Sequence, residues 1–232
     1  MTGMPLSKAP LKTSTPLKNF QIVFLLLIAL ILMIQGWGDR QGLLSHPARA
    51  LFMATLAVNV LLLLFVPFEL FESGPQEIRR QRWLTYVGLV AVGASLWLFP
   101  YADRNELWVW PESSVLRYSG LVCVVGGAGL RVTATMQLGP LFSTFVTIQR
   151  EHALVTTGLY RWVRHPIYTG SLIAVAGICL VFRSKLIWLA LPLYLVGTIW
   201  RIHDEEKLLS AAFGEKYQQY QVRTWRLLPF IY

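Results

Sequence analysis

Residues 20–35 read FQIVFLLLIALILMIQ and hold no charged side chain. A stretch of roughly 20 apolar residues is long enough to cross the hydrocarbon core of a bilayer, which is about 30 Å thick. Basic residues precede this stretch, as they precede a signal peptide, but no convincing small-residue cleavage site follows Gln35. We therefore interpret the segment as a retained first transmembrane helix.

Similar apolar segments recur along the chain, and charged residues gather between them. We predict about six membrane spans from this pattern, and the expected fold class is an all-α, polytopic transmembrane helical bundle. The predicted spans cover approximately residues 20–37, 49–70, 83–101, 115–137 and 166–182, with a sixth from 186 to beyond 202.

The composition supports a membrane protein and argues against nucleic-acid binding. Of 232 residues, 55% are hydrophobic and 14% are charged, whereas soluble domains carry about 25% charged residues. The net charge of +9 comes from basic residues scattered at the ends of apolar segments. This placement indicates contact with membrane lipids and their anionic headgroups. Cys123 and Cys179 lie inside apolar segments, so we expect no disulfide framework and no metal site.

The distribution of Lys and Arg predicts the orientation. Basic residues precede the first span, separate the second from the third and the fourth from the fifth, and follow the sixth. An even number of spans places these groups and both termini in the cytoplasm, as in an inner or plasma membrane. Arg183 and Lys185 fall on the opposite side, where we expect long basic side chains to snorkel. Residues 1–19 are expected to form a disordered tail.

The strongest local signal is RHPIYTG at residues 164–170. Pro166 suits the first turn of a helix. The N–H groups of Ile167, Tyr168 and Thr169 would then be free at a positive helix end, which can hold a carboxylate or a phosphate. An ordinary helix start at headgroup depth is the alternative interpretation.

Two further segments carry ionisable or hydroxyl groups. In RIHDEE at residues 201–206, Arg201 and Glu205 are four apart and share a helix face, while Glu206 points about 100° away. This segment is alternatively a helix leaving the bilayer. Residues 149–160 contain a predicted turn at Gly158. The aromatic tail at 213–229 either lies on the membrane surface or caps the site.

The order and spacing of these motifs resemble the isoprenylcysteine carboxyl methyltransferase family and its phospholipid methyltransferase relatives. The matching segments are LVTTGLY at 154–160, RHPIYTG at 164–170, the pair Glu205 and Glu206, and the tail at 213–229. The resemblance covers approximately residues 131–232. It implies a methyltransferase-like catalytic membrane domain at 115–232, preceded by variable transmembrane helices at 20–114.

The resemblance further implies an S-adenosyl-L-methionine-dependent methyltransferase with a cytoplasmic cofactor pocket built from the C-terminal helices and no Rossmann domain. The sequence agrees, since no strand leads into a Gly-rich turn and a helix. The implied acceptor is lipophilic, most like a prenylated cysteine carboxylate. The alternative acceptors are a phospholipid amine and a small thiol. The alternative functions are those of an NADPH-dependent sterol-type reductase and of a non-enzymatic lipid-binding protein. The oligomeric state is left open.

Site residues follow from the same resemblance. Arg201 matches a position implicated in substrate binding or catalysis. Glu205 is preferred to Glu206 because of its spacing from Arg201, and it would receive the cofactor's ammonium or ribose hydroxyls. Arg164 or His165, with the free N–H groups, would receive the cofactor's carboxylate. The implied cofactor-binding residues are His152, Leu154, Val155, Tyr160, His165, Pro166, Tyr168 and Glu205.

Overall fold

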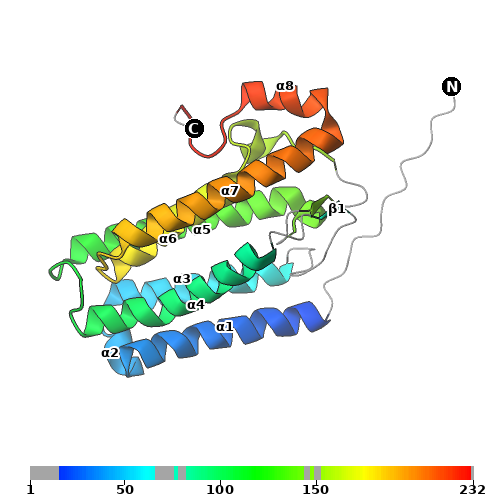
Figure 1. The fold of residues 1–232 in the computed structure, drawn as a ribbon. Coiled ribbons are helices and arrows are strands. Elements are labelled where there is room, and N and C mark those ends of the chain that lie inside the picture. The colour runs from blue at the N-terminus through cyan, green and yellow to red at the C-terminus, as the bar shows by residue number, and fades with distance from the viewer. Residues whose placement is uncertain (1–15, 66–75, 78–81, 144–146, 149–152, 231–232) are drawn as a thin grey trace, which may run out of the picture.

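Long helices packed side by side make up the computed structural model, which describes residues 16–65, 76–77, 82–143, 147–148 and 153–230 (Figure 1). Among the described residues, six long helices overlap the six predicted spans, so the all-α fold is confirmed. Residues 66–70 of the second predicted span lie outside the described residues. They are α1 Pro16–Trp37, α3 Pro47–Leu62, α4 Arg82–Arg104, α5 Ser114–Leu138, α6 Pro166–Val181 and α7 Ile187–Phe213. The shorter elements are α2 Arg40–Leu44, η1 Leu63–Phe65, β1 Gln76–Glu77, η3 Gly139–Leu141, β2 Thr147–Ile148, η4 Gly158–Arg161 and α8 Glu215–Arg223.

The N-terminal tail only partly follows the prediction. Helix α1 already begins at Pro16, because proline is well suited to a first helical turn. Residues 16–19 are therefore helical, and the prediction of disorder there was wrong. The rest of the predicted tail lies outside the described residues.

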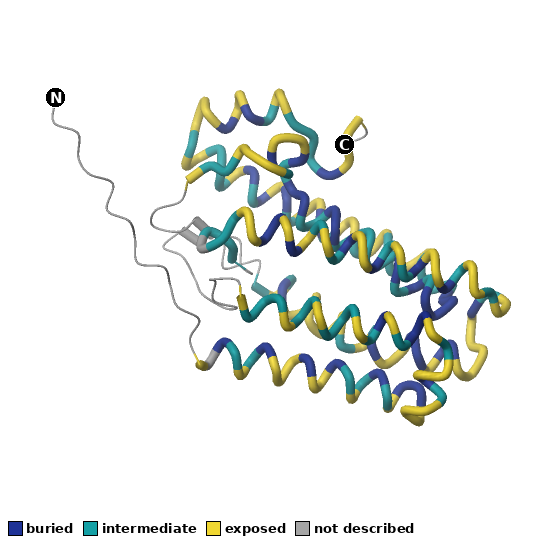
Figure 2. Tube along the Cα trace, turned by 180° about the vertical axis from the view of Figure 1, so that it is seen from behind, coloured by how far each residue is buried: buried dark blue, intermediate teal, exposed yellow. Residues whose placement is uncertain are grey.

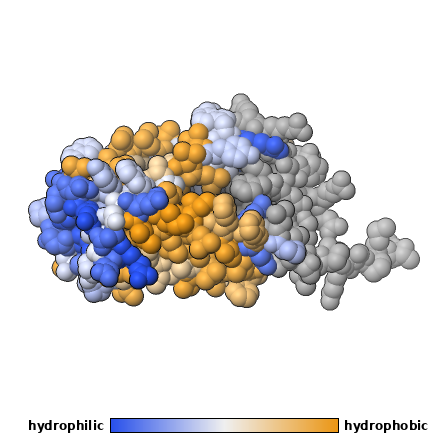
Figure 3. All heavy atoms as spheres, turned by 90° about the horizontal axis from the view of Figure 1, so that it is seen from below, coloured by the Kyte–Doolittle hydropathy of each residue, from blue (hydrophilic) through white to orange (hydrophobic). Residues whose placement is uncertain are grey.

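Within the described ranges, four helices are long and apolar enough to cross a membrane: α1, α3 with η1, α4 and α5. Helix α6 is apolar but has 16 residues, which corresponds to about 24 Å at 1.5 Å per residue. Helix α7 has 27 residues and carries its charges in its second half. The view from below shows an apolar surface over the middle of the bundle and a hydrophilic surface at one end (Figure 3). An apolar surface around the middle of a helical bundle is what a lipid bilayer would contact.

Glycines bring α5 and α6 into close contact. A Cβ atom on Gly120 or Gly127 of α5, or on Gly170 or Gly177 of α6, would meet the facing helix's atoms at 2.5–2.7 Å. Small residues of this kind let helix backbones approach in a membrane. Gly170 therefore serves helix packing, and α5 fixes the position of the α6 start.

The two ends of the bundle differ in character. The "far end" contains α2, the α4–α5 loop and the α6–α7 turn, and the "site end" contains the α6 start, the α7 C-terminus and α8 (Figure 1). The buried apolar core lies toward the far end, where the Phe52 ring meets the Phe182 ring edge-on at 5.6 Å. At the site end, β1 and β2 pair antiparallel, with Gln76 opposite Ile148. Figure 2 shows buried positions along the inward faces of the helices.

A buried ion cluster closes the far end. The Asp103 carboxylate, which is 1% exposed, accepts hydrogen bonds from Arg117 at 2.7 and 3.0 Å and from Arg183 at 2.7 Å. Arg49 adds an ion pair at 3.5 Å. Arg117 also pairs with Glu112 at 2.7 Å. The expectation that Arg183 snorkels was wrong, because Arg183 is buried against a carboxylate that sequence alone does not place beside it.

Candidate active site

The C-terminal tail folds back over the start of α6. Gly214 ends α7 with a φ of 54°, a conformation that glycine adopts without steric cost, and α8 then reverses along α7 (Figure 1). Past α8, the carbonyl of Trp225 accepts from the Arg164 N–H at 2.8 Å, and the carbonyl of Leu227 accepts from Thr169 Oγ1 at 2.7 Å. The tail therefore holds the RHPIYTG turn in place from outside.

The first turn of α6 is less open than expected. His165 is the N-cap and Pro166 the first helical residue, as predicted. The N–H groups of Tyr168 and Thr169 both donate to the His165 carbonyl, at 3.1 and 3.2 Å. The prediction that these two N–H groups are free was therefore wrong, because the N-cap carbonyl already takes them.

Glu206 occupies the centre of a closed ion cluster. Its carboxylate accepts from Arg164 Nε at 2.9 Å and from Arg226 Nε at 3.0 Å, and it lies 3.4 Å from His165 Nε2. Its exposed fraction is 5%. Arg164 also donates to the carbonyls of Gln221 and Thr224. Glu206 thus ties the α6 start and the tail to α7, and the Arg164 guanidinium is taken up by this role.

Glu205 lies in a different, more open arrangement. Its carboxylate accepts from the Tyr168 hydroxyl at 2.9 Å and lies 3.8 Å from His165 Nδ1. The Tyr168 hydroxyl in turn accepts from Arg201 Nε at 2.8 Å. The Glu205 side chain remains 32% exposed. Arg201, Tyr168 and Glu205 therefore form a row of hydrogen-bonded side chains that ends on an accessible carboxylate.

Helix α4, from the N-terminal half of the protein, contacts this hydrogen-bonded row at Arg201. Arg201 NH1 donates to Thr85 Oγ1 at 2.9 Å, and the Trp83 and Trp200 rings meet edge-on at 5.7 Å. Thr85 is buried. The α4 start, which the resemblance does not cover, thus helps to position Arg201.

Aromatic residues from η4 and α8 cover the site. The Tyr220 hydroxyl donates to the Tyr160 carbonyl at 2.6 Å, and the Tyr160 hydroxyl donates to the Ala134 carbonyl at 3.3 Å. Burial, with the Glu205 charge nearby, raises the pKa of Tyr160 well above its usual range. The Tyr217 hydroxyl is buried without a hydrogen-bond partner among the described residues. Burial first, then the charges of Glu206 and Glu205, raises the pKa of Tyr217 as well.

The structure brings most of the predicted site residues together. Contacts given above link His165, Tyr168, Arg201 and Glu205, and Pro166 lies between His165 and Tyr168 at the start of α6. Burial raises the pKa of Tyr160, and Tyr160 lies close enough to Glu205 for the carboxylate charge to add to this shift. Leu154 and Val155 are half-buried in the segment before η4, and no described contact ties them to this group. His152 lies outside the described residues.

Sequence reasoning missed Glu206's partners and the Tyr217 hydroxyl. Arg226 follows Glu206 by twenty positions, and no local spacing rule pairs residues so far apart. The available sequence signal was Gly214 itself, which stands between an apolar helix and an aromatic tail. Its positive φ in the structure lets the chain fold back and bring Arg226 to Glu206.

Comparison with known proteins places these residues in one family. The family model described as "Isoprenylcysteine carboxyl methyltransferase (ICMT) family" matches residues 120–211, which include the α5–α6 glycines and the Arg201–Glu206 segment. A rice (Oryza sativa subsp. indica) "Probable protein-S-isoprenylcysteine O-methyltransferase" is 34% identical over 141 residues, covering 58% of this chain and 68% of that protein.

Further relatives carry the same name. The human "Protein-S-isoprenylcysteine O-methyltransferase" is 33% identical, over 53% of this chain and 45% of that protein. The Schizosaccharomyces pombe protein is 35% identical, over 57% of this chain and 56% of that protein. The chain therefore spans about half of the length of these two relatives.

A solved structure shares the fold. The "eukaryotic intramembrane Ras methyltransferase ICMT" superposes with a TM-score of 0.58 at 22% sequence identity, covering 92% of this chain and 75% of that one. The similarity extends over the N-terminal helices, which lie outside the segments that carry the sequence resemblance.

Proposed function

Because the chain belongs to the isoprenylcysteine carboxyl methyltransferase family and is an integral membrane methyltransferase, we propose that it transfers a methyl group from S-adenosyl-L-methionine to the carboxylate of a prenylated cysteine. The observation that carries this proposal is the chain from Arg201 through Tyr168 to an exposed Glu205. Membership of a methyltransferase family argues against a reductase. The acceptor is inferred from the chemistry of the site.

The cofactor fits the groups around Glu205. S-adenosyl-L-methionine, when bound, supplies a methyl group on a sulfonium centre. The accessible Glu205 carboxylate suits its ammonium or ribose hydroxyls, and the buried Tyr217 hydroxyl offers an unused donor nearby. Tyr168 and Tyr160 provide aromatic faces, which attract cations and pack on flat rings. Leu154, Val155 and His152 are proposed as further cofactor contacts from the family resemblance.

Glu206 and Arg164 have a structural role in this proposal. Three positively charged or hydrogen-bonding groups already surround the Glu206 carboxylate. Removing one partner from a buried ion pair typically costs about 3–5 kcal/mol, so drawing Arg164 away to bind a cofactor carboxylate would be expensive. His165 keeps its Nε2 beside Glu206 and turns its Nδ1 toward Glu205, so Nδ1 is the ring atom that we propose for that carboxylate.

Arg201 favours an anionic acceptor. Its guanidinium is held between the Tyr168 and Thr85 hydroxyls, at the point where α7 leaves its apolar half. A planar guanidinium matches a carboxylate bidentately. A phosphatidylethanolamine amine, in contrast, would bring a positive charge toward Arg201. A lipophilic acceptor can approach along the apolar surfaces of α4 and α7, and its carboxylate then meets Arg201.

In the reaction, the acceptor's carboxylate oxygen forms a bond to the methyl carbon while that carbon's bond to sulfur breaks, leaving S-adenosylhomocysteine. A carboxylate is ionised at neutral pH, so no residue is needed as a general base. Arg201 orients the acceptor and Glu205 orients the donor. Alignment of this kind supplies much of the rate of a two-substrate reaction. In this proposal the site end faces the cytoplasm, because cytoplasmic loops of membrane proteins carry an excess of Lys and Arg.

The test is methyl transfer to acceptors of three classes. Purified protein is given S-adenosyl-L-methionine carrying a labelled methyl group together with an amine-blocked S-farnesyl cysteine, phosphatidylethanolamine or a small alkyl thiol. A methyl ester releases volatile labelled methanol in base, whereas methylated amines and thioethers do not. We expect base-labile product from the farnesyl cysteine alone.

Two comparisons make the result specific. Arg201→Gln should reduce ester formation at least tenfold, while Arg40→Gln, a matched change at the far end, should leave it unchanged. Label transferred to the amine or the thiol, with none released as methanol, would overturn the carboxylate assignment and leave the methyltransferase assignment standing.

A further inference from the structure

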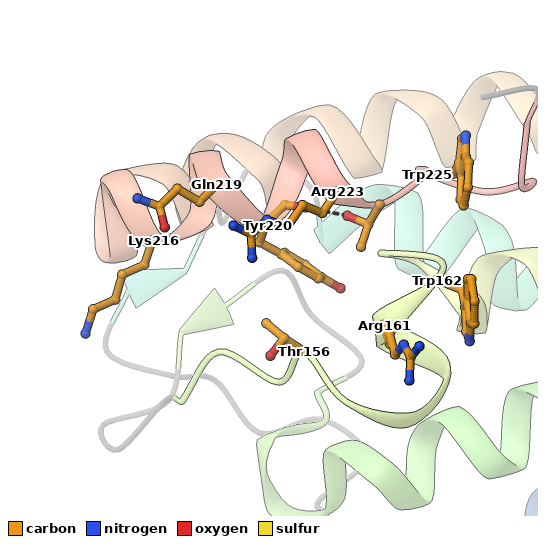
Figure 4. Close-up of a pocket in the computed structure, with 9 residues that line it drawn as sticks. Thr156, Arg161, Trp162, Lys216, Gln219, Tyr220, Arg223 and Trp225 are labelled. Carbon is orange, nitrogen blue, oxygen red and sulfur yellow. Dashed lines mark hydrogen bonds between the residues drawn. The ribbon is translucent and has the colours of Figure 1, made fainter.

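A hollow lies between the segment before α6 and the C-terminal cap, which consists of α8 and the tail to Leu228. Its volume is about 500 Å³, and it is bordered by α8 on one side and by the segment from Thr156 to Trp162 on the other (Figure 4). None of its lining residues belongs to the proposed cofactor set. Tyr220 stands between the two, since its ring borders the hollow while its hydroxyl bonds to the Tyr160 carbonyl.

The lining is positively charged. Arg161, Lys216 and Arg223 border the hollow, and no carboxylate of the described residues lines it. All three are exposed, and no acidic side chain among the described residues forms an ion pair with any of them. Arg161 lies over the Trp162 ring at 5.0 Å. Thr156, Gln219 and Thr224 add neutral polar groups. This combination complements an anion that presents several oxygens.

The hollow lies close to the start of the apolar helix α6. The tail carbonyl of Leu227 accepts from Thr169, one turn into α6, and Val163 pairs with Trp225 beside the hollow. Large apolar side chains on the same segments remain open to the surroundings: Trp162 is 55% exposed, Val222 88% and Phe230 86%. Exposed Trp and Phe next to basic residues are typical of a protein surface at the membrane–water interface.

We propose that this hollow is a binding site for the headgroup of an anionic phospholipid. The three cations would pair with the phosphate and any further charged oxygens, and Trp162, Val222 and Phe230 would contact the acyl chains. A free phosphate would make no use of these apolar side chains. A soluble acidic protein would leave them exposed at the rim of its interface.

An occupied hollow would also stabilise the cap. Lys216, Tyr220 and Arg223 belong to α8, whereas Thr156 and Arg161 belong to the η4 segment. A headgroup bound to both would hold α8 against η4, in addition to the hydrogen bond from Tyr220 to Tyr160. Anionic lipid would then reduce local opening of the cap over the candidate site.

The test measures lipid retention directly and is independent of methyl transfer. Protein purified in detergent is mixed with equal amounts of dioleoyl phosphatidylglycerol and dioleoyl phosphatidylcholine, and bound lipids are counted by native mass spectrometry. The variant Arg161→Gln/Lys216→Gln/Arg223→Gln should lose phosphatidylglycerol preference at least fivefold, because one basic residue near an anionic surface is worth about 1 kcal/mol. The control Arg40→Gln/Lys185→Gln/Lys207→Gln, with the same change in net charge outside the hollow, should keep the preference.

Three outcomes would overturn the proposal. Equal preference in both triple variants would show that the hollow is not the site. Displacement of phosphatidylglycerol by millimolar inorganic phosphate would assign the hollow to a free anion. Tighter binding of a hexaglutamate peptide than of phosphatidylglycerol would assign it to a protein partner. If the hollow variant melts early, Lys216→Gln alone is used, with Lys207→Gln as its control.

A second measurement checks the effect on the cap. Backbone amides of residues 215–228 should exchange hydrogen at least threefold more slowly in phosphatidylglycerol nanodiscs than in phosphatidylcholine nanodiscs, and the difference should vanish in the hollow variant. Equal exchange in both lipids would contradict a stabilised cap.

Discussion

The far end and the site end of this bundle each hold a buried cluster of arginines and carboxylates, and we propose that only the site end binds a cofactor. At the far end, Arg49, Arg117 and Arg183 converge on Asp103, and Glu106 and Glu112 take up remaining guanidinium N–H groups. At the site end, Glu206 is enclosed in the same way, while its neighbour Glu205 stays one-third exposed at the end of a hydrogen-bonded chain. Burial of charge therefore does not identify a site. At the far end the exposed carboxylates, Glu106 and Glu112, pair with buried guanidinium groups. Glu205 instead accepts from the Tyr168 hydroxyl, and we propose that this difference in partners marks the cofactor site.

The largest expected effect tests the structural role of the far-end cluster. Asp103→Asn leaves three arginines without their shared counter-ion, and loss of one member of a buried ion cluster costs about 3–5 kcal/mol of the free energy of unfolding. Thermal unfolding in detergent measures it. Glu106→Gln is the control, since that carboxylate is mostly exposed and exposed pairs contribute at most about 1 kcal/mol.

The same variant sharpens the comparison when binding is measured. The fraction of Asp103→Asn that remains folded should bind S-adenosylhomocysteine like the unmodified protein. A folded variant with tenfold weaker binding would mean that the two ends are coupled.

At the site end, the Tyr168 hydroxyl is expected to matter next. Tyr168→Phe keeps the ring but removes the group that joins Arg201 to Glu205. A hydrogen bond to a charged group is worth about 1.5–3 kcal/mol, so we expect kcat/KM for methyl transfer to fall roughly tenfold or more. Tyr118→Phe, which removes an exposed hydroxyl at the far end, should change kcat/KM less than twofold. Equal effects of the two substitutions on kcat/KM would contradict a specific role for the Tyr168 hydroxyl.

A smaller effect is expected at Thr85, which contacts Arg201 from α4. Thr85→Val preserves the shape of the side chain but removes the acceptor, and net hydrogen bonds contribute about 0.5–1.5 kcal/mol. KM for the acceptor should rise about threefold, with S-adenosylhomocysteine affinity unchanged. Thr55→Val is matched to it, because Thr55 bonds only to its own helix in the described structure. A change in cofactor affinity alone would contradict the assignment of Arg201 to the acceptor.

The smallest effect is a pH dependence at the far end. The hydrogen bonds from Arg117 lower the pKa of Glu112 from 4.5 to about 2. A lowered pKa in the folded state stabilises the protein above pH 4.5, and this contribution is lost as the pH falls toward 2. Glu112→Gln should therefore flatten the decline of the melting temperature below pH 4.5. A decline as steep as in the unmodified protein would show that the pair contributes nothing.

The sequence predicted the helices well because hydropathy is a local property. Each long apolar segment could be recognised without knowledge of its neighbours, and the start of α6 at Pro166 followed from proline chemistry. The ion clusters could not be predicted in this way. Arg183 and Asp103 are 80 positions apart, and Arg226 reaches Glu206 only because the chain turns back at Gly214. The choice of Glu205 over Glu206 rested on Arg201 spacing, whereas the structure separates the two by burial and partners.

The most direct test of this account is a calorimetric titration of S-adenosylhomocysteine into the detergent-purified protein and its Glu205→Gln variant. Glu215→Gln serves as a control for loss of an exposed carboxylate, and thermal unfolding confirms that each variant is folded. The account predicts that Glu205→Gln weakens binding roughly 10- to 100-fold, as loss of a charge-assisted hydrogen bond would, with Glu215→Gln unchanged. Unaltered binding by a folded Glu205→Gln variant would contradict the central claim that the accessible carboxylate marks the cofactor site.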